Sequence, residues 1–363
     1  MPHFNSEMLI LARESREMSQ SELAEKVRLP QTIISRLEGG LTTPTNQQVG
    51  DLASALLYPL ELFYQEDRIF GFNASVFFHR KKADIPARTL RRIHAVLNFT
   101  RMHIGRLMLS TSINAERELI RMTVEEFGTP ERIAQLTRSM LNLPSGPIKN
   151  LTAAVEDAGI IVATHKFGSS RGDAVSEWVP GHPPIVLMNV DETVGGDRYR
   201  WSLAHELGHL IMHKFPSENM EEEANRFAAE LLLPQSDIKH HLRNVRISNL
   251  ALLKSIWKVS MGALLERAKQ LGTINSSQYR YMRVNFSRMH YNTREPAELD
   301  VPVEKPSLIR ELIQAHIAQL RFSIEELAKL LHLLVEEFID LYAPEFGRTG
   351  LKLVSSSALG RMA

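Results

Sequence analysis

Short apolar stripes alternate with tight turns along the first part of the chain, and this pattern predicts a series of short helices. The first stripe begins with the apolar residues 9–12. Ser19 and Glu22 have the spacing of a capping box, in which each side chain satisfies a backbone N–H of the first turn, so a helix is expected over 22–27. Two glycines follow residues 31–38 and are typical of a helix C-terminus. Two further helices are expected over 44–57 and 59–63, which completes a five-helix domain over 1–66.

Residues 67–146 have a mostly helical pattern, and the chain then changes to a mixture of helices and strands. The proline- and glycine-containing residues 143–147 mark this change. Two apolar runs, 159–163 and 184–189, have the length and composition of buried strands. The longer apolar segment 195–213 predicts a helix. Helices are also expected over 151–158, over 222–233 and from there to about 285, so a mixed domain is expected over 147–290.

A final helical piece is expected over 300–345, after a linker that contains several prolines. Its residues 323–328 repeat the pattern of residues 19–24, and the repeat extends to Phe338 and Leu341. Acidic residues nevertheless stand at several positions that are polar or basic in the first copy. Because acidic groups repel phosphates, we interpret the second copy as a packing or sensing unit that does not read DNA. The last residues of the chain are expected to form a loose tail.

The predicted helix 195–213 contains the run His205-Glu206-Leu207-Gly208-His209. Residues four apart on a helix share a face, with Cβ atoms about 5–6 Å apart, so both imidazoles can reach one zinc ion. Glu206 lies beside them and can accept a proton from the metal's water. Catalytic zinc sites usually have three protein ligands and leave the fourth position to water. The motif therefore predicts a third ligand elsewhere in the chain.

An acidic helix start, Glu221-Glu222-Glu223, follows twelve residues after the second histidine and offers this ligand. Glu221 and Asn225 lie four apart, so both can face the site, the first as a ligand and the second as a hydrogen-bond partner of a ligand histidine. Glu223 is about 200° away from Glu221 around the helix and is expected to face elsewhere, with Glu222 intermediate. We therefore favour Glu221. His213 extends the row of histidines but drifts too far around the helix for ligation, and we interpret it as a packing or substrate-side residue.

Composition narrows the class of protein. Of the 363 residues, 44% are hydrophobic and 23% are charged, as in soluble globular proteins of two or three domains. No apolar run approaches the roughly 20 residues of a membrane span, and no secretory signal is visible. The chain has no cysteine, so a zinc site must use His, Asp or Glu. These observations favour a cytoplasmic protein without a membrane partner.

Charge is distributed unevenly although the net charge is only +1. Residues 1–66 carry five Lys and Arg against nine Asp and Glu. The balance reverses over 80–106, where eight basic residues face only Asp84. Such a segment is either a phosphate-binding surface or a solvated helix face. The basic residues are Arg80, Lys81, Lys82, Arg88, Arg91, Arg92, Arg101 and Arg106.

The metal motif and the acidic helix together resemble the ImmA/IrrE metallopeptidases, which are bacterial and phage proteins that cleave repressors. The resemblance rests on the runs 198–209 and 221–234 and extends over roughly 147–270. It implies zinc ligands at His205, His209 and Glu221 and a general base at Glu206. The implied fold class is mainly α, with a small gluzincin-like α+β core between a helical linker and a C-terminal helical piece. The residue that stabilises the oxyanion stays open, with Tyr199 and His182 as candidates.

Residues 7–63 resemble the Xre/Cro/C1 helix-turn-helix family, with residues 31–38 as the recognition helix. The resemblance implies that this helix enters the major groove of DNA. Gln31 suits adenine, and Arg36 suits guanine or a phosphate. The alternative is a helical domain kept for dimerisation or partner docking, because this segment is net acidic. The candidate DNA contacts are Gln20, Gln31, Thr32, Ser35 and Arg36.

These features predict a DNA-binding transcriptional regulator with a zinc-dependent metallopeptidase domain that acts in a bacterial or phage stress or defence response. The expected partners are operator DNA, a second copy of the chain in a homodimer, and a protein substrate. That substrate is a repressor encoded nearby or the chain's own linker, unless the domain has no substrate at all. One alternative is a transcription factor whose peptidase-like domain senses a ligand or metal without proteolysis, although the intact Glu206 argues against it. Another is an interaction component of a toxin–antitoxin or phage-defence locus.

Overall fold

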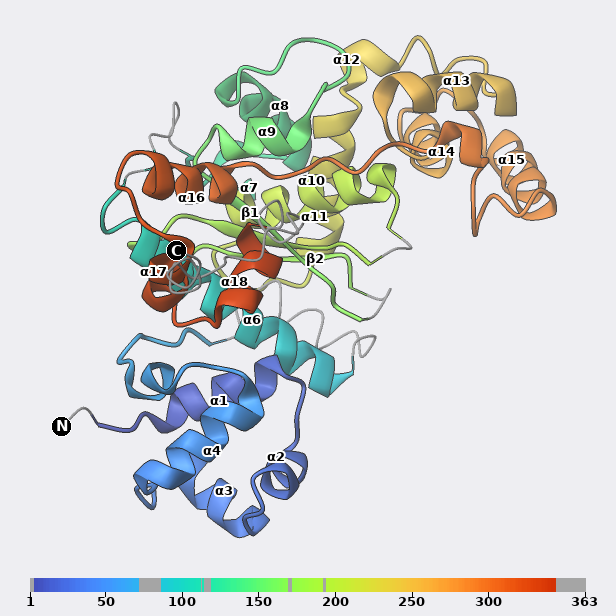
Figure 1. Cartoon of the computed structure of the whole chain (residues 1–363). Helices are drawn as coiled ribbons and strands as arrows, with labels where there is room; N and C mark the ends of the chain where they lie inside the picture. Colours follow the sequence, from blue (N-terminus) through green and yellow to red (C-terminus); the bar gives the residue numbers. More distant parts are fainter. Residues whose placement is uncertain are drawn as a thin grey trace, which may run out of the picture. The chain divides into compact units, whose positions relative to one another are not determined.

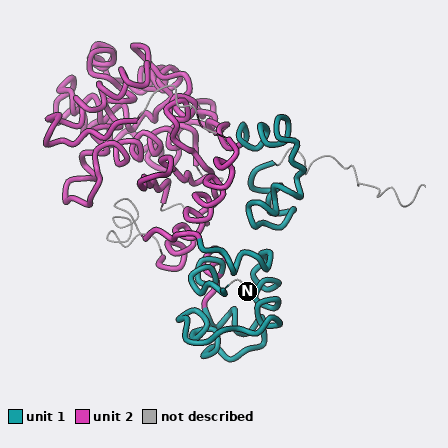
Figure 2. Tube along the Cα trace, turned by 90° about the vertical axis from the view of Figure 1, so that its left-hand side faces the viewer, with its two compact units in different colours: residues 1–12, 20–66, 310–363 teal, residues 13–19, 67–309 magenta. Residues whose placement is uncertain are grey.

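The computed structural model describes residues 3–71, 86–111, 113, 119–168, 172–191 and 194–343. Over these residues the chain is mainly helical, with one three-stranded sheet, which confirms the predicted fold class (Figure 1). The chain divides into two compact units, coloured in Figure 2. Unit 1 comprises residues 1–12, 20–66 and 310–363, and unit 2 comprises residues 13–19 and 67–309. None of the helices in the described ranges has both the length and the apolar character needed to span a bilayer.

The N-terminal part of unit 1 is built from short helices, and α1 continues into unit 2. Leu23, Ile34 and Leu52, from three different helices, are fully buried there. Thr45 caps α4 in a capping box with Gln48, which satisfies backbone donors at both positions. The expected helices are all present, although the second starts two residues earlier than expected and the fifth is a 3-10 turn. Their bounds are α1 Ser6–Ser15, α2 Gln20–Lys26, α3 Gln31–Glu38, α4 Asn46–Leu56 and η1 Leu60–Tyr64.

The C-terminal helices of unit 1 repeat the second and third helices of the chain. Helix α17, Ile324–Leu330, and helix α18, Val335–Tyr342, have the same lengths and the same spacing as α2 and α3. Ser323 and Glu326 form a capping box at the start of α17. Phe338 of α18 is fully buried, as is Ile34 of α3. Helix α16, Leu308–Ala318, precedes this pair, and the expected C-terminal tail lies outside the described residues.

The sheet of unit 2 has the strand order β1-β3-β2. The central strand β3, Ile185–Asn189, is buried along its whole length. It pairs in parallel with β1, Ile161–His165, and antiparallel with β2, Ala174–Glu177. Successive side chains of a strand point to opposite faces of the sheet. Ser176 of β2 contacts α10 on one face, and Glu177 contacts α6 on the other, so these two helices cover opposite faces (Figure 1).

The remaining helices of unit 2 surround this sheet. On the α10 face, α8 packs on α11 and α9 packs against β1. Helix α6 is the longest helix of the described chain, and its Arg101 forms a buried ion pair with Glu177. Burial lowers the pKa of Arg101 to about 10. The bounds are α6 Ala87–Leu107, α7 Val124–Phe127, α8 Pro130–Met140, α9 Leu151–Glu156, α10 Gly196–Met212, α11 Met220–Leu232, α12 Gln235–Ile238, α13 Ile247–Trp257, α14 Met261–Gln270 and α15 Ser276–Arg288.

Four described arginines of the basic segment are paired with carboxylates of unit 2, and Arg88 donates to the backbone carbonyl of Glu17. Arg91 lies 3.6 Å from Glu14, Arg92 lies 3.6 Å from Glu17, and Arg106 lies 2.5 Å from Asp67. Arg101 pairs with Glu177. These guanidinium groups neutralise acidic groups of the same chain, while Arg88 and Arg91 remain exposed on α6. Arg80, Lys81, Lys82 and Asp84 lie outside the described residues.

A strap, residues 296–307, lies between α15 and α16, begins with the 3-10 turn η2 (Ala297–Leu299), and crosses the start of the metal-motif helix. Its Val301 carbonyl accepts a hydrogen bond of 2.9 Å from Gly196 N, the first residue of α10. Its Glu304 forms an ion pair with Arg200, a fully buried residue of the same helix. The Glu304 carboxylate also accepts bonds of 2.8 and 2.9 Å from the backbone and side chain of Thr152. The strap therefore supplies the counter-charge for a buried cation of α10.

Candidate metal centre

Close packing of α10 on α11 creates the site. Gly208 of α10 faces Phe227 and Ala224 of α11, and a Cβ atom at Gly208 would lie 3.0 Å from the Phe227 ring and 3.4 Å from Ala224 Cα. The missing side chain therefore lets the two helices approach each other closely. This approach places the first turn of α11 beside the histidine-bearing face of α10. One face of α10 carries His205 and His209, while its apolar residues, among them Leu203, Leu207 and Ile211, are fully buried.

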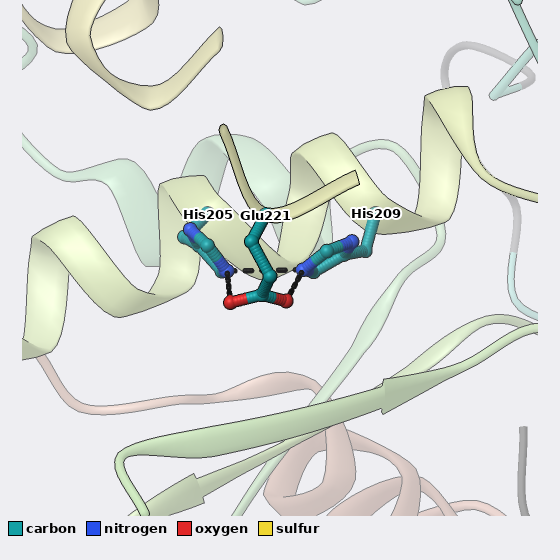
Figure 3. A group of neighbouring side chains, drawn as sticks. All are labelled: His205, His209 and Glu221. Carbon is teal, nitrogen blue, oxygen red and sulfur yellow. Dashed lines mark hydrogen bonds and ion pairs between the residues drawn. The ribbon is translucent and has the colours of Figure 1, made fainter. Parts of the chain in front are cut away.

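His205, His209 and Glu221 converge on one point. The two Nε2 atoms lie 3.0 Å apart, and the Glu221 carboxylate lies 3.2 Å from Nε2 of His209 and 3.8 Å from Nε2 of His205. One ligand atom from each residue lies within 4.8 Å of the other two (Figure 3). Two nitrogens bound tetrahedrally to one zinc lie about 3.3 Å apart. The arrangement therefore fits a zinc ion, with two neutral imidazoles and a carboxylate as donors.

Glu206 lies on the buried side of the same helix. Its residue is 2% exposed, and Ser176 Oγ of β2 donates a hydrogen bond of 2.6 Å to its carboxylate. The strand thereby fixes the orientation of an acidic group that lies next to His205 in the sequence. Ser176 was not identified from the sequence, because nothing in its segment marks it as a partner of the metal motif. Its place in a strand pattern does not indicate that it contacts Glu206.

His213 and Glu223 form a second group that the sequence interpretation did not identify. His213 Nδ1 lies 3.0 Å from His209 Nδ1, and His213 Nε2 lies 2.9 Å from a carboxylate oxygen of Glu223. Helix α10 ends at Met212, and His213 has extended backbone angles, φ −114° and ψ 91°. The helical drift expected for His213 therefore does not apply, and its ring turns back onto His209. Burial lowers the pKa of His213, and Glu223 faces this histidine instead of the cluster.

The position of Asn225 differs from the expectation. Its side-chain amide donates a hydrogen bond of 2.8 Å to the backbone carbonyl of Glu221. This bond links successive turns of α11, because the two residues are four apart. The side chain thus supports the turn that carries Glu221, and the Nδ1 atom of His209 is contacted by His213.

The two oxyanion candidates lie in different surroundings. Tyr199 is fully buried, and burial raises the pKa of its hydroxyl. Its neighbours include Thr152 and Glu304, on the strap side of α10. The ring of His182 contacts the ring of Phe70 at 5.8 Å, and burial lowers the pKa of this histidine. Neither residue belongs to the group of His205, His209 and Glu221.

Helix α3 presents a polar face in unit 1. Gln31, Thr32, Ser35 and Arg36 are exposed, while the apolar residues between them are buried or half-buried. Gln31 donates a hydrogen bond of 2.8 Å to the side-chain oxygen of Gln20, which in turn donates one of 2.8 Å to Glu38. Of the five candidate DNA contacts, Gln20 is the first residue of α2 and the other four lie on α3.

Two family models match the chain, in the order expected. Residues 9–63 match a model described as a helix-turn-helix, and residues 155–269 match the M78 peptidase model, described as an IrrE N-terminal-like domain. No curated protein matches the chain. The second match runs from the end of α9 to the end of α14 and includes the whole cluster. The helix-turn-helix suggests DNA binding, and the second model supports an enzyme of the metallopeptidase type. The chain therefore carries a helix-turn-helix domain followed by a peptidase domain of the IrrE N-terminal-like family.

Proposed function

We propose that this protein is a DNA-binding transcriptional regulator whose second domain is a zinc-dependent peptidase that cleaves a regulatory protein. The observation that carries the proposal is the convergence of His205, His209 and Glu221, in which the two histidines lie on a motif helix that also carries the buried Glu206. The substrate we favour is a repressor-type protein encoded nearby. DNA as a partner and the absence of cysteine support action in the cytoplasm.

The donor set supports zinc. His205 and His209 offer Nε2 atoms 3.0 Å apart, and Glu221 offers a carboxylate within 4 Å of both. Zinc bound by these groups would lower the pKa of its water to about 7 and polarise a peptide carbonyl. We assign Glu206 as the general base, which would accept a proton from the attacking water and pass it to the leaving amine. Ser176 holds the Glu206 carboxylate in one orientation.

The environment of Glu206 favours an enzyme over a protein that only senses a ligand. A sensor has no need of a carboxylate beside its metal, and an acidic group that is 2% exposed is costly to bury. The bond from Ser176 offsets part of that cost while keeping the group oriented. Such an arrangement is expected where the carboxylate takes part in chemistry.

Replacing Glu206 by Gln tests the proposal. The full chain, loaded with zinc, is incubated with the product of the neighbouring gene, and the products are identified by mass spectrometry. We expect cleavage by the wild type and a loss of at least about a hundredfold in the E206Q variant, since general-base catalysis contributes roughly 10²–10⁴. Glu222→Gln is the matched control, because Glu222 is exposed on α11. Equal cleavage by wild type and E206Q, or none by either, contradicts the enzymatic role.

The proposed DNA binding also bears on the oligomeric state of the protein. Helix-turn-helix proteins usually bind DNA as dimers, on two half-sites about one helical turn apart. We propose a homodimer on DNA for this reason.

A further inference from the structure

The hydrogen-bonding capacity of Glu223 determines where the protons lie in the chain His209–His213–Glu223. An ionised carboxylate can only accept, so Nε2 of His213, 2.9 Å away, carries a proton and donates it. A neutral imidazole has one protonated nitrogen, so Nδ1 of His213 is then an acceptor. His209 Nδ1 lies 3.0 Å from that atom and must be the donor. His209 is thereby held in the tautomer whose unprotonated Nε2 faces His205 and Glu221.

The side chain of His213 is only 5% exposed, and its ring contacts His209 through one nitrogen and Glu223 through the other.

We propose that His213 and Glu223 are positioning residues for the metal centre, and that they fix the tautomer and ring orientation of His209. This inference rests on the proposed zinc site. Histidines that bind metals usually donate their other N–H to a carboxylate, a carbonyl or a water. Here the carboxylate lies one imidazole further away, and the two hydrogen bonds transmit its effect to His209 Nδ1. The role expected of Asn225 is thus performed by a histidine beyond the end of α10.

The placement of Glu223 links the same pair to the third ligand. Glu221 and Glu223 both lie in the first turn of α11, and each contacts a histidine of the α10 segment, at 3.2 and 2.9 Å. One turn of α11 therefore carries both a candidate ligand and the carboxylate that orients another. Glu222, between them, is exposed, and this makes it a matched control for the charge of the helix.

Zinc affinity of the full chain tests the proposal, measured by competition with a chromophoric chelator. We expect a loss of about 10–100-fold in His213→Leu, which removes both hydrogen bonds. Glu223→Gln should lose less, because its carboxamide oxygen still accepts from His213. Glu222→Gln should bind as the wild type does. Nitrogen-15 shifts of the zinc-loaded wild type should show His209 Nδ1 protonated and His213 Nδ1 unprotonated, a signature that simple packing does not produce.

The possible outcomes separate this inference from the proposed function. If the wild type binds no zinc, the proposed function fails together with the inference. If the wild type binds zinc and His213→Leu binds it equally well, the positioning role alone is overturned. An equal loss in Glu222→Gln and Glu223→Gln would assign the effect to the charge of α11 and would also overturn it. If His213→Leu does not fold, the comparison of Glu223→Gln with Glu222→Gln decides.

Discussion

One hydroxyl on an edge strand determines the orientation of the buried carboxylate of Glu206. Ser176 Oγ donates to that carboxylate at 2.6 Å, and both residues are about 2% exposed. A hydrogen bond to a charged group contributes about 1.5–3 kcal/mol, and leaving the carboxylate without it costs a similar amount. The contribution of Ser176 should therefore appear in the rate and not in the binding of metal.

Ser176→Ala is expected to lower kcat for peptide cleavage by roughly ten- to hundredfold, which corresponds to about 1.4–2.7 kcal/mol. Zinc affinity should change by less than about threefold, because Ser176 contacts no candidate ligand. Rate and affinity are measured on the same preparation. Ser255→Ala, on the exposed side of α13, is the control. Unchanged kcat in S176A would show that β2 does not orient the base.

Gly196 is a position at which a single added carbon atom is expected to lower the stability of the protein. An added Cβ would overlap the backbone carbonyls of Val301 and Pro302 in the strap. Gly196→Ala should therefore lower the free energy of unfolding by about 1–3 kcal/mol, as overpacking does. Gly105→Ala is the control, since nothing lies within 4 Å of its added Cβ, and it should be neutral or slightly stabilising. Chemical denaturation measures both. Equal stability of the two variants would show that the strap shifts without cost.

The residues that could be predicted are those whose chemistry and spacing lie within one helix. His205, His209 and Glu206 were recognisable on this basis, and Glu221 was favoured from its helical angle to Asn225. The contact of His213 was not predictable, because it depends on where α10 ends. The contact of Ser176 depends on strand order, which residues far apart in the sequence determine.

At the scale of elements, the two helix-turn-helix pairs differ in the charge of their second helices. Helix α3 has the exposed residues Thr32 and Arg36, whereas α18 has Glu336 and Asp340 exposed at the same positions. Both helices bury an apolar residue, Ile34 or Phe338, at the same relative place. The packing requirement is therefore common to both, and only the exposed surface of α3 is suited to a polyanion.

Arg36→Ala is expected to weaken binding to the promoter of the chain's own gene by about five- to hundredfold, or roughly 1–3 kcal/mol. If Arg36 contacts a phosphate, the slope of log affinity against log salt should also fall by about one. Gel shifts at several salt concentrations measure both quantities. Arg288→Ala, exposed at the end of α15, controls for net charge. Equal losses of affinity in the two variants would show that Arg36 contributes only its charge and no specific contact with DNA.

Most elements could be located from the sequence, because hydrophobic periodicity and turn residues are local signals. Residues 31–38 were predicted as a helix and α3 has these bounds, while 195–213 was predicted where α10 spans Gly196–Met212. The start of α2 was placed two residues late, since Gln20 and Ser21 are polar and carry no periodic signal. The parallel pairing of β1 with β3 could not be predicted, because register arises from contacts between segments and not within them.

At the scale of the whole molecule, the chain leaves unit 1 after residue 66 and returns to it at residue 310. Unit 2 contains every residue of the candidate metal centre, and unit 1 contains the helix-turn-helix match except for its residues 13–19. A ligand that binds only one folded unit stabilises that unit by mass action. Zinc should therefore raise the stability of unit 2 and leave that of unit 1 unchanged.

Removing zinc with a chelator is expected to lower the stability of unit 2 by about 4 kcal/mol relative to zinc at a thousand times its Kd. The transition of unit 1 should keep its Tm. Differential scanning calorimetry of the full chain with and without zinc shows both transitions. His205→Ala should remove the dependence on zinc. A shift of both transitions by the same amount would contradict metal binding confined to unit 2.

The strap has a consequence for where the peptidase domain can be cut. The family match ends at residue 269, yet the fully buried guanidinium of Arg200 takes its counter-charge from Glu304. A fragment that ends before the strap would leave the buried guanidinium of Arg200 without its acidic partner. Removing one partner of a buried ion pair commonly lowers the free energy of unfolding by about 3–5 kcal/mol. A fragment that keeps Glu304 is therefore expected to be more stable than one that ends at residue 269.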